Sequence, residues 1–298
     1  MDAAPNVEAE GGGGGWAALA DGVRLVATDL DGTLLRPDGS VSAYTVDLLA
    51  RARAATLPVV FVTGRPPRWM SGVVEATGHA GPAICANGAL VVDLASGRVV
   101  ERHPIPHDVL VTVVDTLRAE VPGIAFAMEY APDDDDAPFA HEFGYRARYA
   151  VDDAHRGHDV RSLAVGRDVV KLLARVADAG HDADSFLAHG EEHVAHLVTL
   201  THSDADDVLL EMSAPGVSKG AALAALAGRL GVPAPRAAAI GDMPNDVPML
   251  DWAGVPLAVA GAHRAVVEAA AAVLPGPDGD GVARFVDAVL GAAPLGSL

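Results

Sequence analysis

The 298-residue sequence has few of the features that mark secreted, membrane-spanning or nucleic-acid-binding proteins. Its one cysteine, Cys85, cannot form a disulfide within the chain and follows an apolar residue, so we expect a core thiol in a cytoplasmic protein. No apolar run approaches the ~20 residues that span a bilayer. Acidic residues outnumber basic ones and give a net charge of −19, which argues against nucleic acid or an anionic membrane as a partner. Only two of the 21 basic residues are lysines, Lys171 and Lys219, so each lysine is informative.

The N-terminal segment, residues 1–20, is acidic and contains five consecutive glycines. It lacks the basic and then apolar pattern of a signal peptide, and glycine-rich sequence behaves as a flexible coil. We therefore expect a disordered tail that precedes the folded part of the chain.

A short stretch that ends a predicted buried strand carries two carboxylates. The apolar run from Val23 to Leu30 predicts the strand, Asp29 and Asp31 stand at its end, and Gly32 indicates a sharp turn. Side chains two residues apart share one side of a regular strand. Two carboxylates at one strand tip repel each other unless a cation lies between them or one of them holds a proton. Both arrangements suit chemistry on a phosphate.

Alternating short apolar runs and amphipathic segments predict an α/β fold with a Rossmann-like parallel sheet. We predict that residues 21–87 and 214–292 form this core, and that residues 88–213 form an inserted α+β domain. The predicted elements of the inserted domain are a hairpin at 89–103, a helix at 108–119, a strand at 124–129, an irregular polar segment at 132–167, a strand at 169–176, a helix at 182–188, and a second hairpin over 194–201 and 208–212. In the core, Ser42 is expected to cap a helix to Ala55 with Val46, Leu48 and Leu49 on its buried face.

Further polar residues stand where other predicted core elements begin or end. Thr63 and Gly64 follow the second strand, and Lys219 begins a helix that Ser218 caps, where its ammonium and the free backbone amides can face an anion. Asp242, Asn245 and Asp246 follow a late strand. Open α/β sheets bind ligands at the carboxyl edge of their strands, so we expect these side chains to meet there.

Four sequence stretches in this order resemble the haloacid dehalogenase superfamily, and more narrowly its Cof-type sugar-phosphatase branch with an inserted C2-type α/β cap. They are Asp-Leu-Asp-Gly-Thr-Leu-Leu from Asp29, Val-Thr-Gly-Arg from Val62, Gly-Val-Ser-Lys-Gly from Gly216, and Gly-Asp-Met-Pro-Asn-Asp from Gly241. The similarity covers about residues 22–290. Met243 and Pro244 depart from the small polar residue that this branch more often has after the aspartate, and we expect them to alter the loop without removing a metal ligand.

The resemblance implies a Mg²⁺-dependent phosphatase that acts on small phosphorylated metabolites, with sugar phosphates as the expected class, through an aspartyl-phosphate intermediate. A carboxylate can attack phosphorus and divide one difficult step into two, provided that the opposing charges are neutralised. We expect a monomer or weak homodimer, and the sequence leaves the oligomeric state open. The implied roles are nucleophile for Asp29, general acid/base for Asp31, phosphate or substrate binding for Thr63, Gly64, Lys219, Asn87 and Asn245, and metal binding for Asp29, Asp242, Asp246 and the backbone carbonyl of Asp31.

Two other functions remain open on the same residues. A phosphotransferase of the phosphomannomutase type would use Asp29 and Asp31 but pass the phosphoryl group to a second sugar. A non-catalytic binding protein is also possible, although the complete set of acids and Lys219 argues against it. A dehalogenase is disfavoured because that chemistry uses no metal and does not need the second aspartate.

Some signals in the inserted region are interpreted as structural. The spacing from His189 to His193 matches an inverted zincin motif, but Gly190 argues against the continuous helix that this motif needs, so we interpret these histidines as surface residues. The run Asp133–Asp136 is interpreted as a solvated loop. Lys171 is interpreted as a surface residue, with contact to the leaving group as the alternative. The segment His141–Tyr145 is a weaker candidate for reaching the substrate.

Overall fold

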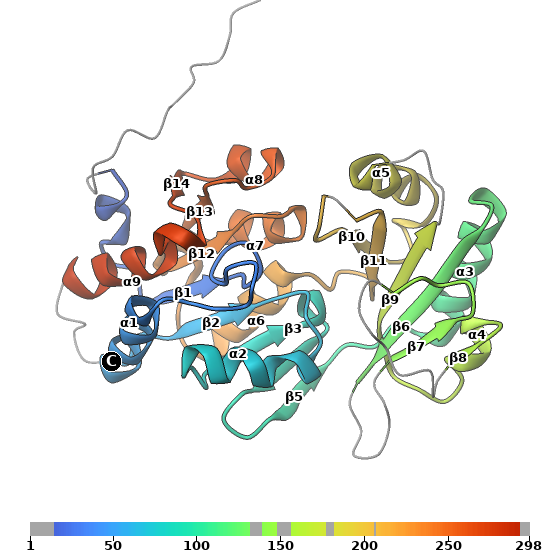
Figure 1. The fold of residues 1–298 in the computed structure, drawn as a ribbon, viewed down its shortest axis with the longest axis horizontal. Helices are drawn as coiled ribbons and strands as arrows, with labels where there is room; N and C mark the ends of the chain where they lie inside the picture. The colour runs from blue at the N-terminus through green and yellow to red at the C-terminus, as the bar shows by residue number, and fades with distance from the viewer. Residues whose placement is uncertain (1–14, 132–138, 148–155, 177–181, 206, 293–298) are drawn as a thin grey trace, which may run out of the picture.

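The protein is built on two β-sheets, and helices cover both of them (Figure 1). The computed structural model describes residues 15–131, 139–147, 156–176, 182–205 and 207–292. The larger sheet contains, in spatial order, β14 (Ala272–Leu274), β13 (Val255–Val259), β12 (Ala237–Gly241), β1 (Leu25–Thr28), β2 (Val59–Val62), β3 (Pro82–Cys85), β4 (Leu90–Asp93) and β5 (Arg98–Arg102). Its first six strands are parallel, which confirms the predicted fold class.

Helices lie on both faces of the larger sheet. They are α1 (Ala43–Ala54), α2 (Met70–Thr77), α6 (Lys219–Arg229), α7 (Val247–Trp252), α8 (Arg264–Ala269) and α9 (Gly281–Ala292). Alternation along the strands separates two apolar clusters: Val26 and Phe61 pack with the α1 and α9 side, whereas Ala27 and Val60 pack with the α6 and α7 side. Ser42 caps α1 as predicted, its side chain accepting the backbone N–H of Thr45.

Several expectations for the core need correction. The hairpin β4–β5 pairs antiparallel with β3 and extends the larger sheet, so it does not belong to the inserted sheet as the boundary at residue 88 implied. Val46 on α1 is 36% exposed, and the buried positions there include Thr45 and Ala52 instead. Residues 1–14 lie outside the described part, but residues 17–20 form a short 3₁₀ helix, η1 (Ala17–Ala20), rather than a disordered tail. The preceding Trp16 anchors it by packing against Phe285 of α9.

The smaller sheet comes entirely from the middle of the chain and is mostly antiparallel. Its spatial order is β10 (Thr199–Thr201), β11 (Leu209–Ser213), β9 (Val169–Val176), β6 (Ile124–Tyr130), β7 (Phe139–Glu142) and β8 (Arg156–Gly157). The helices α3 (His107–Glu120), α4 (Val160–Leu163) and α5 (Ala183–Val194) accompany it. We call this part the cap. The cap is inserted between β5 and α6 of the core, as the resemblance predicts.

The faces of the cap sheet differ in character. Phe126, Leu172 and Met212 point to the apolar cluster beneath α3 and α5. The alternate residues, which include Lys171 and Glu211, line a cavity between cap and core. One face of the sheet therefore stabilises the cap, and the other is available for recognition.

Two expectations for the cap are wrong. The described parts of 132–167 are not irregular, because they contain β7, β8 and α4; the Asp133–Asp136 run lies outside the described residues. The helix α5 continues through Gly190 to Val194 instead of ending near Ala188. A Cβ atom at Gly190 would lie 2.9 Å from side-chain carbons of Leu200 and Leu210, so the glycine permits close packing on the sheet and does not end the helix.

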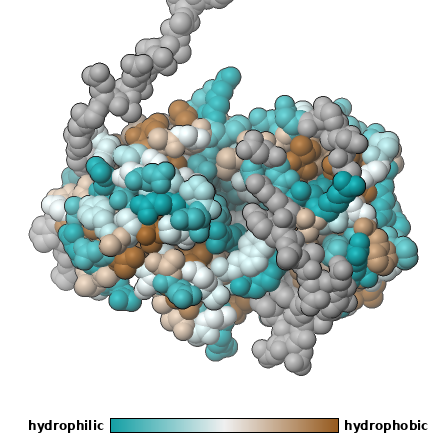
Figure 2. All heavy atoms as spheres, in the orientation of Figure 1, coloured by the Kyte–Doolittle hydropathy of each residue, from teal (hydrophilic) through white to brown (hydrophobic). Residues whose placement is uncertain are grey.

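Hydrophilic side chains predominate on the face drawn in Figure 2, where apolar ones lie in small separate groups. Within the described ranges, no helix combines the length and the apolar character that crossing a membrane requires.

Candidate active site

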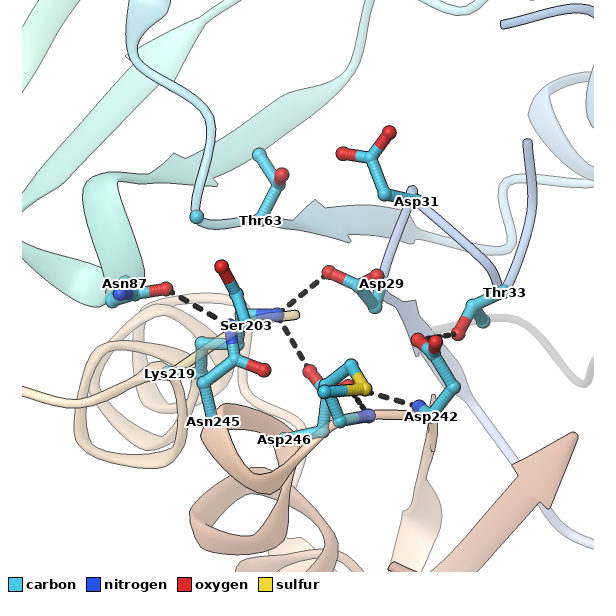
Figure 3. Close-up of polar contacts among 12 residues, drawn as sticks. Asp29, Asp31, Thr33, Thr63, Asn87, Ser203, Lys219, Asp242, Asn245 and Asp246 are labelled. Carbon is cyan, nitrogen blue, oxygen red and sulfur yellow. Dashed lines mark hydrogen bonds and ion pairs between the residues drawn. The ribbon is translucent and has the colours of Figure 1, made fainter. Parts of the chain in front are cut away.

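The candidate site lies at the carboxyl edge of the parallel strands. The strand β1 stands between β12 and β2, so the loops that follow these three strands meet although they are far apart in the sequence. Asp29 follows β1, Thr63 follows β2 and Asp242 follows β12 (Figure 3). The predicted convergence of these three residues is confirmed.

Lys219 is the buried cation of the site. It is 1% exposed, and its Nζ lies 2.6 Å from Oδ1 of Asp29 and 2.6 Å from Oδ1 of Asp246. Burial acts to lower the pKa of Lys219, but the two carboxylates outweigh it, so the pKa stands above its usual value. The ammonium is therefore fixed between the predicted nucleophile and the loop after β12. It does not line the cavity itself but supports Asp29, which does.

Asp246 organises the loop after β12. It belongs to the 3₁₀ helix η6 (Pro244–Asp246) and is fully buried. Its Oδ2 accepts the backbone N–H groups of Asp242 at 2.9 Å and Met243 at 3.0 Å. Met243 contributes its backbone amide to this arrangement, so the departure from the usual residue leaves the loop intact.

Thr33 and Gly32 hold the Asp242 carboxylate in place. The Thr33 hydroxyl donates to Oδ1 of Asp242 at 2.7 Å. Gly32 has φ = +77°, and a Cβ there would lie 2.3 Å from Oδ2 of Asp242, so only glycine leaves room for this carboxylate. Burial first, and then the charge of Asp246, raises the pKa of Asp242 to about 7.

The acidic cluster fits a hard divalent cation. One carboxylate oxygen from each of Asp29, Asp242 and Asp246 lies within 4.8 Å of the others. Burial is also the main cause that raises the pKa of Asp29 well above its usual value, with Lys219 opposing it and the neighbouring acids reinforcing it. Mg²⁺ prefers oxygen ligands such as carboxylates, and a bound Mg²⁺ would neutralise their mutual repulsion. Both oxygens of Asp246 are already engaged, so Asp29 and Asp242 are the more accessible ligands.

Asp31, the predicted general acid/base, lies apart from the buried acids and is paired with an arginine. Its side chain is 59% exposed and points away from the buried acids (Figure 3). The guanidinium of Arg65 binds both carboxylate oxygens, with Nε 2.7 Å from Oδ2. Asp31 and Arg65 both line the cavity, so this ion pair lies where a substrate would enter.

The loop after β2 presents the predicted phosphate-binding residues. Thr63 is buried, and its Oγ1 accepts the backbone N–H of Arg65 at 3.0 Å. The hydroxyl hydrogen therefore remains available as a donor. Thr63 and Gly64 both line the cavity together with Asp29.

Asn87 and Asn245 form a buried amide pair. Asn245 Nδ2 donates to Asn87 Oδ1 at 3.2 Å, and Asn87 Nδ2 donates to Glu211 of the cap. Asn245 lines the cavity, but Asn87 does not. Asn87 therefore holds the cap residue Glu211 instead of taking the predicted role of facing a bound substrate. Among the described residues, the hydrogen bond that Asn245 donates goes to Asn87. The Oδ1 of Asn245 is buried and has no hydrogen-bond partner among the described residues.

The cap closes the other side of a cavity of about 250 Å³. Sequence reasoning missed two of the ion pairs that line it, Arg68 with Glu129 and Arg175 with Asp207. Tyr145 also lines it, as the weaker candidate segment suggested. Strict alternation in β9 puts Lys171 and Arg175 on one face, a pattern that the sequence carried and that could have pointed to this wall.

A second cluster lies on the cap helix α5. His189, Glu192 and His193 bring their ligand atoms within 4.8 Å of one another, because α5 is continuous through Gly190. The reason given for discounting the pattern, a broken helix, is therefore wrong. The three side chains are partly or fully exposed, which agrees with their interpretation as surface residues.

Comparison with known proteins identifies the family. A profile described as haloacid dehalogenase-like hydrolase matches residues 26–286, most of the chain. The chain belongs to this family. The resemblance stated from the sequence is thereby confirmed, and this haloacid dehalogenase-like hydrolase is a phosphoric monoester hydrolase.

Several relatives match it over most of their length. The pyridoxal phosphate phosphatase YbhA of Escherichia coli (strain K12) is 28% identical over 271 residues, which cover 88% of this chain and 97% of YbhA. The HMP-PP phosphatase of Escherichia coli (strain 55989 / EAEC) is 30% identical over 254 residues, which cover 78% of this chain and 82% of that protein. A solved haloacid dehalogenase-like hydrolase from B. subtilis has 25% identity and a TM-score of 0.72, covering 89% of this chain and 99% of that one.

Proposed function

We propose that the protein is a Mg²⁺-dependent phosphatase of small phosphorylated metabolites that works through an aspartyl-phosphate intermediate. The observation that carries the proposal is the position of Asp29. Its carboxylate lines the cavity between core and cap while Lys219 and the Asp242 loop hold it from behind. This arrangement suits a nucleophile that must stay fixed as an anionic substrate approaches.

Asp29 performs the first step. Its carboxylate oxygen attacks phosphorus, the bond from phosphorus to the ester oxygen breaks, and the phosphoryl group passes to Asp29. Lys219 stays paired with Asp29 on the buried side and offsets the negative charge that two anions bring together. The Thr63 hydroxyl donates to a phosphoryl oxygen, and Asn245 faces the same space.

A Mg²⁺ ion bound by Asp29, Asp242 and the Asp31 carbonyl would supply neutralisation of the phosphoryl charge. Thr33 and Gly32 hold the Asp242 carboxylate in the orientation that such binding needs. The backbone amides on Asp246 keep the loop that carries Asp242 in place.

Asp31 moves the protons. It gives a proton to the leaving alkoxide in the first step and takes one from the water that hydrolyses the aspartyl phosphate in the second. The bidentate contact with Arg65 must be exchanged for one with the leaving oxygen before the first transfer. Because Asp31 is exposed at the edge of the cavity, this change needs no rearrangement of the core.

The substrate is a small phosphorylated metabolite in this proposal. The named substrate of YbhA, pyridoxal phosphate, is a small phosphate ester, and a cavity of about 250 Å³ beneath the cap suits molecules of that size but excludes a folded phosphoprotein. Sugar phosphates remain the predicted class. A cytoplasmic location and a monomer or weak homodimer also remain predictions.

Metal-dependent release of phosphate tests the proposal. Purified protein is incubated with a panel of small phosphate esters, with MgCl₂ or with EDTA, and compared with Asp29→Asn, which keeps the size of the side chain but cannot attack. We expect release only with Mg²⁺, and a loss of about 10⁴-fold or more in the variant. Full activity of Asp29→Asn, or no release from any ester, would refute the proposal. Recovery of the phosphoryl group on a second sugar instead of in water would indicate a phosphotransferase.

A further inference from the structure

Lys171, the other lysine of the chain, is also buried at the site. It is 4% exposed and lies on β9, on the face of the cap sheet that looks into the cavity. Lys171 therefore lines the cavity from the cap, whereas Lys219 supports Asp29 from the core side without lining the cavity. The interpretation of Lys171 as a surface residue is wrong.

The ammonium of Lys171 joins the cap to the phosphate-binding loop. Its Nζ donates to the backbone carbonyl of Gly64 at 2.7 Å and to Oε2 of Glu211 at 3.2 Å. Gly64 directly follows Thr63. The cap therefore places a positive charge next to the loop that is expected to hold the phosphate.

Glu211 holds Lys171 in this position and has little capacity left for anything else. Its carboxylate accepts hydrogen bonds from Asn87 and from the Ser203 hydroxyl at 2.9 Å as well as from Lys171. Burial acts to raise the pKa of Glu211, but Lys171 and these hydrogen bonds outweigh it and lower the pKa. The carboxylate stays ionised, so Glu211 is a positioning residue for Lys171.

An ammonium group has three N–H donors, and Lys171 uses two of them among the described residues. Since Lys171 lines the same cavity as Asp29 and Asp31, the third donor is available to a bound substrate. A buried site that offers a fixed donor rejects ligands that cannot accept its hydrogen bond, because the donor is then left unpaired.

We propose that Lys171 is a specificity-determining residue that donates its third hydrogen to an acceptor on the leaving group, close to the ester oxygen. The preferred substrates are phosphate esters whose alcohol carries a hydroxyl, carbonyl or carboxylate oxygen near the phosphorylated carbon, and simple alkyl phosphates are poor ones. The inference rests on the proposed phosphatase function. It also makes the substrate site complete only when the cap contacts Gly64.

The test compares glycerol 3-phosphate with propyl phosphate, which lacks the two hydroxyl groups but has the same chain length. We expect kcat/KM for glycerol 3-phosphate to exceed that for propyl phosphate. Lys171→Met leaves Glu211 without its cation and can fail to fold, so the double variant Lys171→Met with Glu211→Gln is measured beside it. In the soluble variants the preference for glycerol 3-phosphate should fall about ten-fold or more, the value of one charged hydrogen bond.

The matched control is Arg146→Met, which removes an exposed cationic side chain elsewhere on the cap and should leave both values unchanged. A wild-type enzyme that hydrolyses both esters without preference would overturn the inference. So would an equal loss on both substrates in the double variant, since that is the signature of phosphate binding or cap stability. If the wild type released phosphate from no ester at all, the phosphatase function itself would fail, which is a different result.

Discussion

Replacing Lys219 with methionine removes the charge at the centre of the site while keeping most of the length of the side chain. Two carboxylates, on Asp29 and Asp246, each lose a partner at 2.6 Å. All three residues are 5% exposed or less, so water cannot take the place of the ammonium without local opening.

The expected loss of stability follows from this geometry. Breaking a buried ion pair by removing one partner costs about 3–5 kcal/mol, because the remaining charge is left uncompensated. For a chain of this size, that corresponds to a fall in Tm of roughly 5–8 °C. Loss of one fixed cation that stabilises the transition state should also lower kcat by about 10²–10³-fold.

The stability loss should depend on pH with a definite sign. Asp29 has a pKa above its usual value even beside Lys219, so it binds more protons when folded than when unfolded. The contribution of Asp29 to stability is therefore greatest at low pH. It declines as the pH rises from the pKa of Asp29 in the unfolded state to its pKa in the folded state. Without Lys219 the folded-state pKa of Asp29 rises further, so the loss of stability extends over a wider pH range. The pKa of Lys219 itself is raised, so the wild-type cation persists throughout pH 5–8.

The assay is thermal unfolding of the wild type and Lys219→Met in EDTA at pH 5 and pH 8. The difference in Tm should be larger at pH 8. Adding Asp246→Asn to Lys219→Met removes one of the stranded acids and should recover part of the loss. Equal Tm values for the wild type and the single variant at pH 8 would refute the account of Lys219 as a structural counter-ion.

Two further predictions concern the metal. The pKa of Asp242 is raised to about 7, so its carboxylate holds a proton below that pH when no metal is bound. Mg²⁺ affinity measured by calorimetry should therefore weaken by up to about ten-fold as the pH falls from 7 to 6, and it should level off above pH 8. An affinity independent of pH would contradict this prediction. Gly32→Ala should weaken Mg²⁺ binding and abolish phosphate release, because the added Cβ would displace the Asp242 carboxylate. The control is Gly39→Ala: Gly39 has φ = +79° and no heavy atom within 4 Å of an added Cβ, so this variant should show only the backbone strain. Equal effects of the two substitutions would mean that the Asp242 contact is unimportant.

The core could be predicted well because its signals are local and agree with one another. Short apolar runs separated by capped helices left few alternatives to a parallel sheet, and Ser42 and Ser218 cap their helices as expected. The hairpin β4–β5 was misplaced for a physical reason. An antiparallel hairpin shows the same alternation of apolar and polar residues whether it extends the edge of a parallel sheet or begins a new sheet. Only its pairing with β3 shows that it belongs to the larger sheet.

The errors in the cap have different causes. Gly190 has low helix propensity, but the close approach of Leu200 and Leu210 favours a residue without a side chain, so packing outweighs propensity. β7 is short and lies between segments of low apolar content, so periodicity gave no signal for it.

The site shows the same division between local and distant causes. Asp29, Thr63 and Asp242 were predictable because each follows a strand of one parallel sheet, and the topology brings such positions together whatever their separation. The bidentate contact between Arg65 and Asp31 was not predictable. A strand end fixes the position of a side chain, but it does not determine which of several nearby charged groups that side chain binds.

Lys171 and Glu211 explain why specificity is harder to predict from sequence than chemistry. In the core, Asp29 and Asp242 stand at strand ends and Lys219 stands at the start of a capped helix, and such positions have recognisable sequence surroundings. In the cap, the useful side chains lie in the middle of β9 and β11, where an inward-facing charge has the same period as an outward-facing surface residue. Only the presence of the core loop at Gly64, 2.7 Å from the ammonium, makes that face a binding wall. A polar residue on the cap sheet therefore acquires a function from the position of the core beneath it, and variation among such residues can change the leaving group while Asp29 and its supports remain the same.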